Sequence, residues 1–236
     1  MKIYARATLL ILVLILNGCA LGGAYSAKPI EGWVVDAQTK QPLEGVSVVA
    51  YWVLRAGVLE DSSVGELTVL ESVTDRTGRY SFPAWGPKPL PPGVPATTHL
   101  VDEDPQMDYY KAGYRNKYLR NSRPDDPIRF HGPSVRASDW NGKTIEMADI
   151  KSQLNDRAQE LRFFAGSMDS LSDYPCYWRH IPQTLVALDK ESRTLKSVGF
   201  KVAVSLLDSL LASEEFYVTH HPQCGSPRKF FEGHLK

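Results

Sequence analysis

Histidine and cysteine are the residue types in this chain best suited to bind a metal or to take part in catalysis. The 236-residue sequence contains three cysteines and six histidines, which are His99, His131, His180, His220, His221 and His234. His220 and His221 lie close to Cys224, but without a C-x-x-C or H-x-x-x-H spacing they are weak evidence for a metal site. The sequence also lacks a G-x-S-x-G elbow, a glycine-rich phosphate loop and a zinc-knuckle spacing. Because these motifs are missing, the sequence predicts no catalytic residues, no metal and no cofactor.

The N-terminus has the pattern of an export signal. Lys2 and Arg6 precede an aliphatic run from Leu9 to Leu16. Eight aliphatic residues rise about 12 Å as a helix, far less than the roughly 30 Å hydrocarbon core of a membrane, so this run is not a permanent span. Residues 1–18 are therefore expected to form a signal peptide.

The end of this run resembles the lipobox of bacterial lipoproteins. Leu16 and Gly18 match the motif, in which a peptidase cleaves after Gly18 and leaves Cys19 as the acylated first residue. The resemblance implies lipid anchoring through Cys19 and, because Ala20 follows rather than Asp, a location in the outer membrane. The lipid bilayer is then one partner, and residues 19–27 form a short flexible tether. The alternative is an ordinary secretory signal with an incidental Cys19.

Export decides the prediction for the two other cysteines. An oxidising compartment favours a disulfide between Cys176 and Cys224. A metal site shared with His220 and His221, or two free thiols, are the alternatives.

Charge and composition exclude several classes of protein. The 27 basic and 27 acidic side chains balance, and loss of Lys2 and Arg6 with the signal leaves a net charge of about −2. No global field would therefore attract nucleic acid. With 43% hydrophobic residues, the chain is also too apolar to be disordered.

The first half of the chain has the alternating pattern of strands. Strands are expected at residues 30–35, 46–52, 67–74, 79–82 and 143–147, with turns at 36–40 and 75–78. In the second of these strands, Val46, Val48, Ala50 and Trp52 share one face. Short strands separated by turns, without helical patterns between them, predict an antiparallel β-sandwich.

Several motifs in this half resemble the carboxypeptidase regulatory-like domain, a transthyretin-like sandwich. The matching turn and core positions are Gly32, Asp36, Thr39, Pro42, Leu43, Gly45, Val46, Thr74, Asp75, Gly78, Tyr80, Phe82, Gly113 and Tyr114. The resemblance implies a transthyretin/prealbumin-like domain over residues 28–148 that acts as an accessory or binding module. Related peptidases hold zinc in a separate domain through an H-x-x-E pair, and no histidine here is followed by Glu three residues later.

Two segments depart from the family pattern. Residues 83–95 are rich in proline and residues 115–141 are polar, and both are expected to be surface loops. The proline-rich segment could instead be a polyproline II ligand. Tyrosines at 109, 110, 114 and 118 are interpreted as half-buried strand residues, with a binding surface as the alternative.

After residue 150 the apolar spacing changes to three or four residues, which is typical of helices. One amphipathic helix is expected from Ile150 to Leu171, with Asp149 as its N-cap. Its apolar stripe is Leu154, Ala158, Leu161, Ala165 and Met168. The stripe is interpreted as a face packed on the protein itself, although it could also seat a partner helix.

A second helix is expected to begin at Pro182, which suits a first helical position. Its apolar spacing continues through Leu188, Val202 and Leu206 to Leu210. A straight helix of this length would carry the chain too far from Cys176 for a bridge to Cys224. We therefore expect a break near residues 196–199 that gives two antiparallel helices.

The sequence thus predicts an α+β protein: an antiparallel β-sandwich followed, over residues 149–236, by two to three helices. The expected function is a non-enzymatic envelope lipoprotein, a binding or structural accessory module with a protein, peptide or glycan partner. The alternative is a metal-dependent enzyme, because the segment from Pro42 to Trp52 also resembles intradiol dioxygenases. These enzymes bind ferric iron with two tyrosines and an H-x-H pair. Tyr109, Tyr110 and Tyr118 are available here, but no H-x-H occurs.

Overall fold

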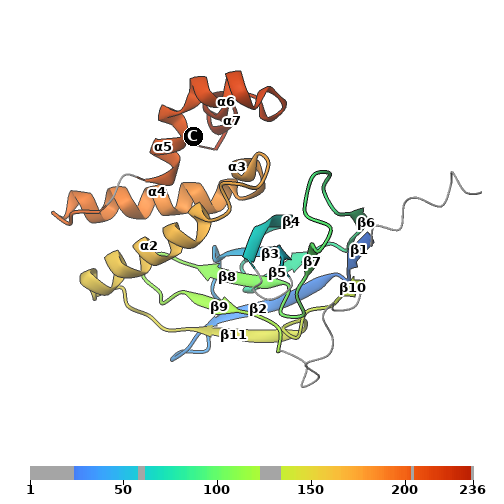
Figure 1. Cartoon of the computed structure of the whole chain (residues 1–236). Coiled ribbons are helices and arrows are strands. Elements are labelled where there is room, and N and C mark those ends of the chain that lie inside the picture. Colours follow the sequence, from blue (N-terminus) through green and yellow to red (C-terminus); the bar gives the residue numbers. More distant parts are fainter. Residues whose placement is uncertain (1–23, 58–61, 123–133, 203–204, 235–236) are drawn as a thin grey trace, which may run out of the picture.

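A computed structural model describes residues 24–57, 62–122, 134–202 and 205–234 of the chain. Figure 1 shows sheets on one side of the molecule and helices on the other, so the chain is an α+β protein as predicted. Cys19 and the rest of the signal pattern lie outside the described residues. None of the helices in these ranges is long and apolar enough to cross a membrane.

Two small sheets form one layer of the sandwich. The first has the order β10-β1-β6 and the second the order β11-β2-β5. Their strands are β1 Ala24–Ala27, β2 Ile30–Asp36, β5 Arg79–Phe82, β6 Trp85–Pro89, β10 Val135–Arg136 and β11 Lys143–Met147. Strand β1 pairs antiparallel with β6, and β2 with β5, whereas the pairs β1–β10 and β2–β11 are parallel. The sandwich was expected to be antiparallel throughout, but it contains these two parallel strand pairs.

A larger antiparallel sheet forms the second layer. Its order is β4-β3-β8-β9, and β7 pairs with one end of β3. The strands are β3 Ser47–Ala56, β4 Ser62–Val73, β7 His99–Leu100, β8 Gln106–Tyr110 and β9 Lys117–Leu119. The central strand β3 is buried along almost its whole length, which requires cover on both faces of the sheet.

Alternation along β3 divides its side chains between two cores. Val48, Ala50 and Trp52 face the two small sheets and join the inner core of the sandwich. The intervening Val49 and Tyr51 face the opposite way and pack against the helices. The strand's period of two therefore places one strand between two apolar layers.

The helices cover the outer face of the large sheet. They are α2 Leu154–Asp169, α3 Tyr177–His180, α4 Pro182–Ser197, α5 Leu206–Ala212, α6 Glu214–His220 and α7 Pro227–Phe231, with a 3₁₀ turn η1 Pro222–Cys224. In Figure 1, α4 lies between the sheets and the group formed by α5, α6 and α7. The described ranges thus hold six α-helices rather than the two to three expected. The apolar stripe of α2 packs on the protein itself, as predicted, because Leu161 and Met168 belong to the apolar core between the large sheet and the helices.

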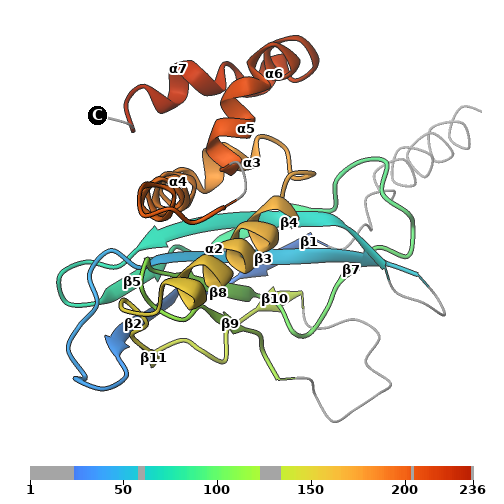
Figure 2. The ribbon, with the colours of Figure 1, turned by 90° about the vertical axis from the view of Figure 1, so that its left-hand side faces the viewer.

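The break in the second predicted helix is present, but the direction after it is not as predicted. Helix α4 ends at Ser197, and Gly199 has a φ of +89°, a conformation that glycine adopts without strain. Figures 1 and 2 show α5 crossing α4 steeply rather than running antiparallel to it. The short helix α6 and the turn η1 bring the chain back to Cys176, so α5 itself need not turn back.

Three local predictions were wrong. Helix α2 begins at Leu154, because Asp149 is held in an isolated β-bridge with Tyr114 and its carboxylate accepts from the Lys151 N–H. The end of the expected tether, Ala24–Ala27, is the strand β1. The expected proline-rich loop contains its partner strand β6.

These two unexpected strands are held by burial of aromatic rings. Tyr25 of β1 is buried in the inner core. Trp85 of β6 packs edge-on against Trp52, with ring centroids 5.1 Å apart. Residues 115–141 likewise contain β9 and β10, while residues 123–133 lie outside the described part.

The predicted disulfide between Cys176 and Cys224 is present, with a Cα–Cα distance of 5.3 Å. It joins the residue before α3 to the turn η1. A carboxylate fixes the start of α4 as well, because Glu71 of β4 accepts from the N–H groups of Gln183 and Thr184 at 3.0 and 2.6 Å. The sheet thereby caps a helix whose own N-cap, Ile181, has no side-chain acceptor.

Candidate functional site

The acidic residues of the family motif hold turns. Asp36 Oδ1 accepts hydrogen bonds from the N–H groups of Gln38 and Thr39 at 2.9 and 2.8 Å, and Oδ2 accepts from the Tyr114 hydroxyl at 3.2 Å. The bond from the Thr39 backbone is the main reason that the pKa of Asp36 lies below its usual value. Asp75 similarly accepts from the hydroxyl and N–H of Thr77. Both carboxylates are therefore committed to local backbone geometry.

The glycines of the motif leave room for neighbouring groups. A Cβ atom at Gly32 would lie 2.5 Å from the Tyr80 hydroxyl oxygen, inside the sandwich core. Gly78 has a φ of +75°, and a Cβ there would overlap the carbonyl oxygen of Val34. Among the other motif positions, Pro42 forms an isolated β-bridge with Val35, and Gly45 and Gly113 adopt positive φ in turns. The ring of Phe82 lies in the inner core. The structure thus places the motif in turns and in the core.

The tyrosines considered as iron ligands point in different directions. The hydroxyl of Tyr109 is 2.8 Å from that of Tyr80 in the inner core. The next residue, Tyr110, faces the helices, and its ring lies 4.9 Å from that of Phe164. Tyr118 of β9 is 46% exposed. Because neighbours on a strand project to opposite faces, Tyr109 and Tyr110 do not converge on one ion.

The histidine and cysteine positions are also separated. The sulfur of Cys224 is bonded to Cys176, and His220 stacks on Phe216 with ring centroids 4.8 Å apart. Within the described ranges, no group of three His, Cys, Asp or Glu side chains could hold a metal ion. His131 lies outside those ranges.

A buried carboxylate joins the large sheet to α2. Asp108 of β8 accepts hydrogen bonds from Ser167 Oγ at 2.6 Å and from the Tyr51 hydroxyl at 3.2 Å. Burial raises the pKa of Asp108 to about 6. These bonds hold α2 at a fixed position over the sheet, and so fix one wall of a cleft between α2 and α4.

The cleft has a volume of about 530 Å³ and is lined by α2, α4 and the segment that leads into α5. Small residues on α2, among them Ala158 and Ala165, leave space between the two helices that larger side chains would fill. The floor includes Leu161 and Leu188, which are 6% and 2% exposed. The lining residues Ala158 and Asp169 lie eleven positions apart on α2, so the cleft is about 16 Å long.

The cleft also has polar and charged lining residues: Gln159, Arg162, Asp169, Ser192, Lys201 and Ser205. Ser192 of α4 is 3% exposed, and its hydroxyl has no hydrogen-bond partner among the described residues. Arg162 and Lys201 line the cleft and form no ion pair within the described chain. A buried hydroxyl without a partner costs about 1–3 kcal/mol, and a polar atom of a ligand could supply the partner. The cleft is therefore suited to an elongated apolar molecule with a polar end.

Sequence reasoning did not identify this cleft. Ala158, Ala165, Leu188 and Val202 were all recognised as members of apolar stripes. The signal that distinguishes the two alanines is size, because an alanine within a stripe leaves volume beside the helix that a larger apolar side chain would fill. Ser192 lies on the face of the second stripe, four residues after Leu188 and three before Leu195. A serine that interrupts an apolar stripe was therefore the available signal for a polar group at this position.

Comparisons with known proteins do not identify a family. No protein-family model and no curated protein matches the chain. Solved structures with some similarity include 3-chlorocatechol 1,2-dioxygenase from Rhodococcus opacus 1CP, at 15% identity and a TM-score of 0.32 over 54% of this chain. Chlorocatechol 1,2-dioxygenase from Pseudomonas putida gives 14% identity and a TM-score of 0.28 over 55% of this chain.

A third similar structure is the dioxygenase domain of a dioxygenase carbohydrate-binding protein fusion from Streptomyces sp. SirexAA-E. It gives 16% identity and a TM-score of 0.28 over 55% of this chain and 82% of that domain. The chain spans only 61% and 62% of the first two proteins. At these TM-scores the similarity does not indicate a shared activity.

Proposed function

We propose that the chain is a non-enzymatic lipoprotein of the cell envelope, anchored in the outer membrane through acylated Cys19, that binds a small elongated apolar ligand. The sandwich, which we propose to be transthyretin-like and related to the carboxypeptidase regulatory-like domain, acts as the platform. The helical layer carries the binding cleft. This proposal narrows the earlier expectation of a protein, peptide or glycan partner, because about 530 Å³ suits a small molecule.

One observation carries the proposal: the cleft combines an apolar floor with a buried, unpartnered hydroxyl. Leu161 and Leu188 supply the floor, and Ser192 supplies the hydroxyl. An apolar cleft of this length gains free energy when a ligand removes its surface from water, at about 25 cal/mol per Å². Ser192 then gives orientation to a ligand that the apolar surface alone would bind in several ways.

The location depends on the N-terminal segment and has its own test. If Cys19 is the anchor, the N-terminal peptide of the chain purified from its membrane should begin at Cys19 and carry acyl chains. Mass spectrometry of that peptide measures both features. An unmodified cysteine, or a chain that begins elsewhere, would remove the lipoprotein part of the proposal and leave the cleft unaffected.

The dioxygenase alternative predicts a different chemical composition. An enzyme of that type would contain stoichiometric iron with a visible absorption band from tyrosinate ligands. Elemental analysis of the purified chain, together with its absorption spectrum, distinguishes the two. Stoichiometric iron bound by tyrosinate would contradict the non-enzymatic proposal.

Blocking the cleft should abolish ligand binding. The measurement is a titration of the mature chain, carrying Cys19→Ser, with a fatty acid that bears an environment-sensitive fluorophore. We expect saturable, micromolar binding and a loss of about tenfold or more with Ala165→Phe, because the new ring occupies the cleft. Binding that does not saturate would count against the proposal.

A matched variant separates blocking from unfolding. Ala212→Phe makes the same substitution on the exposed end of α5, outside the cleft, and should bind as tightly as the parent chain. Both variants should keep the parent's circular dichroism spectrum. If Ala165→Phe and Ala212→Phe bind the probe equally well, the ligand lies elsewhere.

A further inference from the structure

A second cavity, of about 520 Å³, lies beside the disulfide and is distinct from the α2–α4 cleft. Residues of α3, α6, η1 and α7 line it. The disulfide between Cys176 and Cys224 holds two of these elements together. The cavity therefore lies where the segment from α6 to α7 is tied back to α3.

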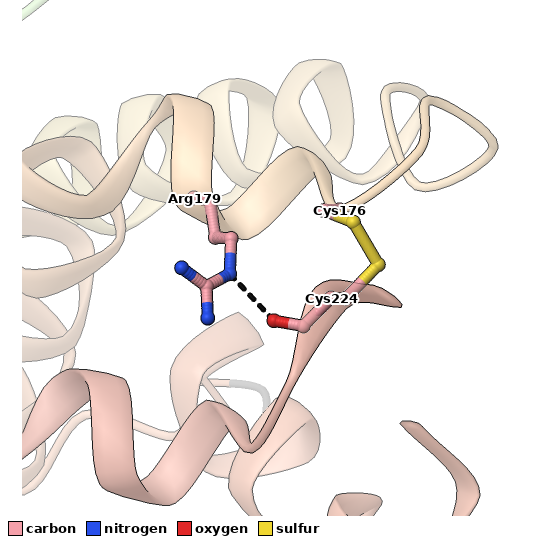
Figure 3. Close-up of a disulfide and its surroundings, with 3 residues drawn as sticks. All are labelled: Cys176, Arg179 and Cys224. Atoms are coloured by element: carbon pink, nitrogen blue, oxygen red, sulfur yellow. Dashed lines mark hydrogen bonds between the residues drawn. A yellow bond between two sulfur atoms is a disulfide. The ribbon is translucent and has the colours of Figure 1, made fainter. Parts of the chain in front are cut away.

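The guanidinium of Arg179 is held in one position at this cavity. Its Nε donates a hydrogen bond to the carbonyl oxygen of Cys224 at 2.5 Å. Its carbon Cζ lies 4.8 Å from the ring centroid of Trp178 and 4.9 Å from that of Phe230. Figure 3 shows the Nε turned to the Cys224 carbonyl and the two terminal nitrogens directed away from the disulfide. An arginine fixed in this way loses little conformational entropy when it binds a ligand.

The charge at the cavity is positive and unpaired. Arg179 and Lys229 both line it, and neither forms an ion pair with another described residue. The nearby acid, Glu214, faces the start of α7, where it accepts from the Arg228 N–H at 2.9 Å. A hydrogen bond from Ser226 is the main cause of the lowered pKa of Glu214. Glu214 is therefore bound to the α7 terminus and leaves the terminal nitrogens of Arg179 unneutralised.

The lack of a side chain at Gly225 leaves one edge of the Arg179 guanidinium uncovered. Gly225 has a φ of +71°, and a Cβ at this position would lie 3.0 Å from Arg179 Nη2. A side chain there would be strained and would crowd the free edge of the guanidinium. Val218, which is 48% exposed, and the ring of Phe230 add apolar surface on the cavity wall.

We infer that this cavity binds an anionic group, a carboxylate or a phosphate, carried on a small apolar body. The planar fork of Arg179 matches two oxygens of either anion, and Lys229 adds a second positive charge. The apolar body would contact Phe230 and Val218. This site is independent of the proposed function, since it shares no lining residue with the α2–α4 cleft.

Three probes of similar size test the inference: phenyl phosphate, benzoate and the neutral benzyl alcohol. Each is titrated into the ¹⁵N-labelled mature chain at millimolar concentrations, where ligands of this size are expected to bind. One or both anions should shift the signals of Gly225, Ser226 and the Arg179 Nε, and which anion binds more tightly identifies the group. Added salt should weaken the binding. Benzyl alcohol should cause no such shifts, and equal binding of all three probes would show an apolar pocket instead.

Two substitutions locate the binding. Arg179→Gln should weaken it by about 10- to 100-fold, because a charge-assisted pair of hydrogen bonds is lost. Lys229→Gln should weaken it by about two- to fivefold. The Lys229 side chain forms no hydrogen bond within the described chain, so this variant decides the matter if Arg179→Gln disturbs folding. Unchanged anion affinity in Lys229→Gln and in a folded Arg179→Gln would overturn the inference.

Discussion

Removal of the disulfide, by replacing Cys176 and Cys224 with serine, should lower the free energy of unfolding by about 4 kcal/mol. The bridge joins residues 48 positions apart, and in the chain-entropy model a loop of this length restricts the unfolded chain by about that amount. Urea unfolding followed by tryptophan fluorescence measures the change. The intact chain should show the same loss after reduction in solution.

The loss should be concentrated in the helices that the bridge ties down. Helix α6 has no fully buried side chain, so it depends on its neighbours and on the bridge for its position. Amide hydrogen exchange should therefore accelerate most in α5, α6 and α7, and least in β2 and β3. Cys19→Ser serves as the control, because it removes a cysteine without touching the bridge. Equal stability of the bridged and bridgeless chains would contradict this account.

Gly78→Ala should destabilise the sandwich by about 3 kcal/mol or more. Its φ of +75° strains any side chain, and the added Cβ would overlap the carbonyl oxygen of Val34. Val34 cannot move aside, because it is fully buried and its N–H donates to the Gly78 carbonyl at 2.8 Å. Thermal or urea unfolding of the variant measures the cost.

Gly142 provides a matched control for the free-energy cost of placing alanine in a left-handed backbone conformation. Its φ is +73°, almost the same as that of Gly78, but a Cβ there would meet nothing within 4 Å. Gly142→Ala should therefore cost only about 1 kcal/mol, which is the strain of a left-handed alanine. The difference between the two variants measures the overlap with Val34. Equal costs would show that strand β2 yields to the new methyl group.

The sequence pattern was sufficient to predict a strand or turn where that element is determined by its own residues. Strand β11, Lys143–Met147, was predicted with its correct bounds, and Asp75 was placed in a turn that it does stabilise through Thr77. The pattern did not predict the strands that depend on a partner far away in the sequence. Strands β1 and β6 contain glycine, proline and alanine, and they form because they pair with each other across about 60 residues.

The candidate site was less predictable than the fold for a similar reason. Periodicity predicts which face of α2 is apolar, but the cleft arises from how that face meets α4. That meeting is fixed by contacts that are remote in sequence: Asp108 holds α2 through Ser167, and Glu71 holds the start of α4. Neither carboxylate has a local motif, because its role depends on a helix that follows many residues later.

The central claim is that the α2–α4 cleft holds a ligand, and native mass spectrometry of the chain purified gently from its own membrane tests it most directly. We predict that the parent chain and Ala212→Phe carry a small, extractable apolar molecule. The same preparation of Ala165→Phe should lack it, because the phenylalanine ring fills the cleft. A parent chain that carries no such molecule, or an Ala165→Phe variant that retains it in equal amount, would contradict the claim.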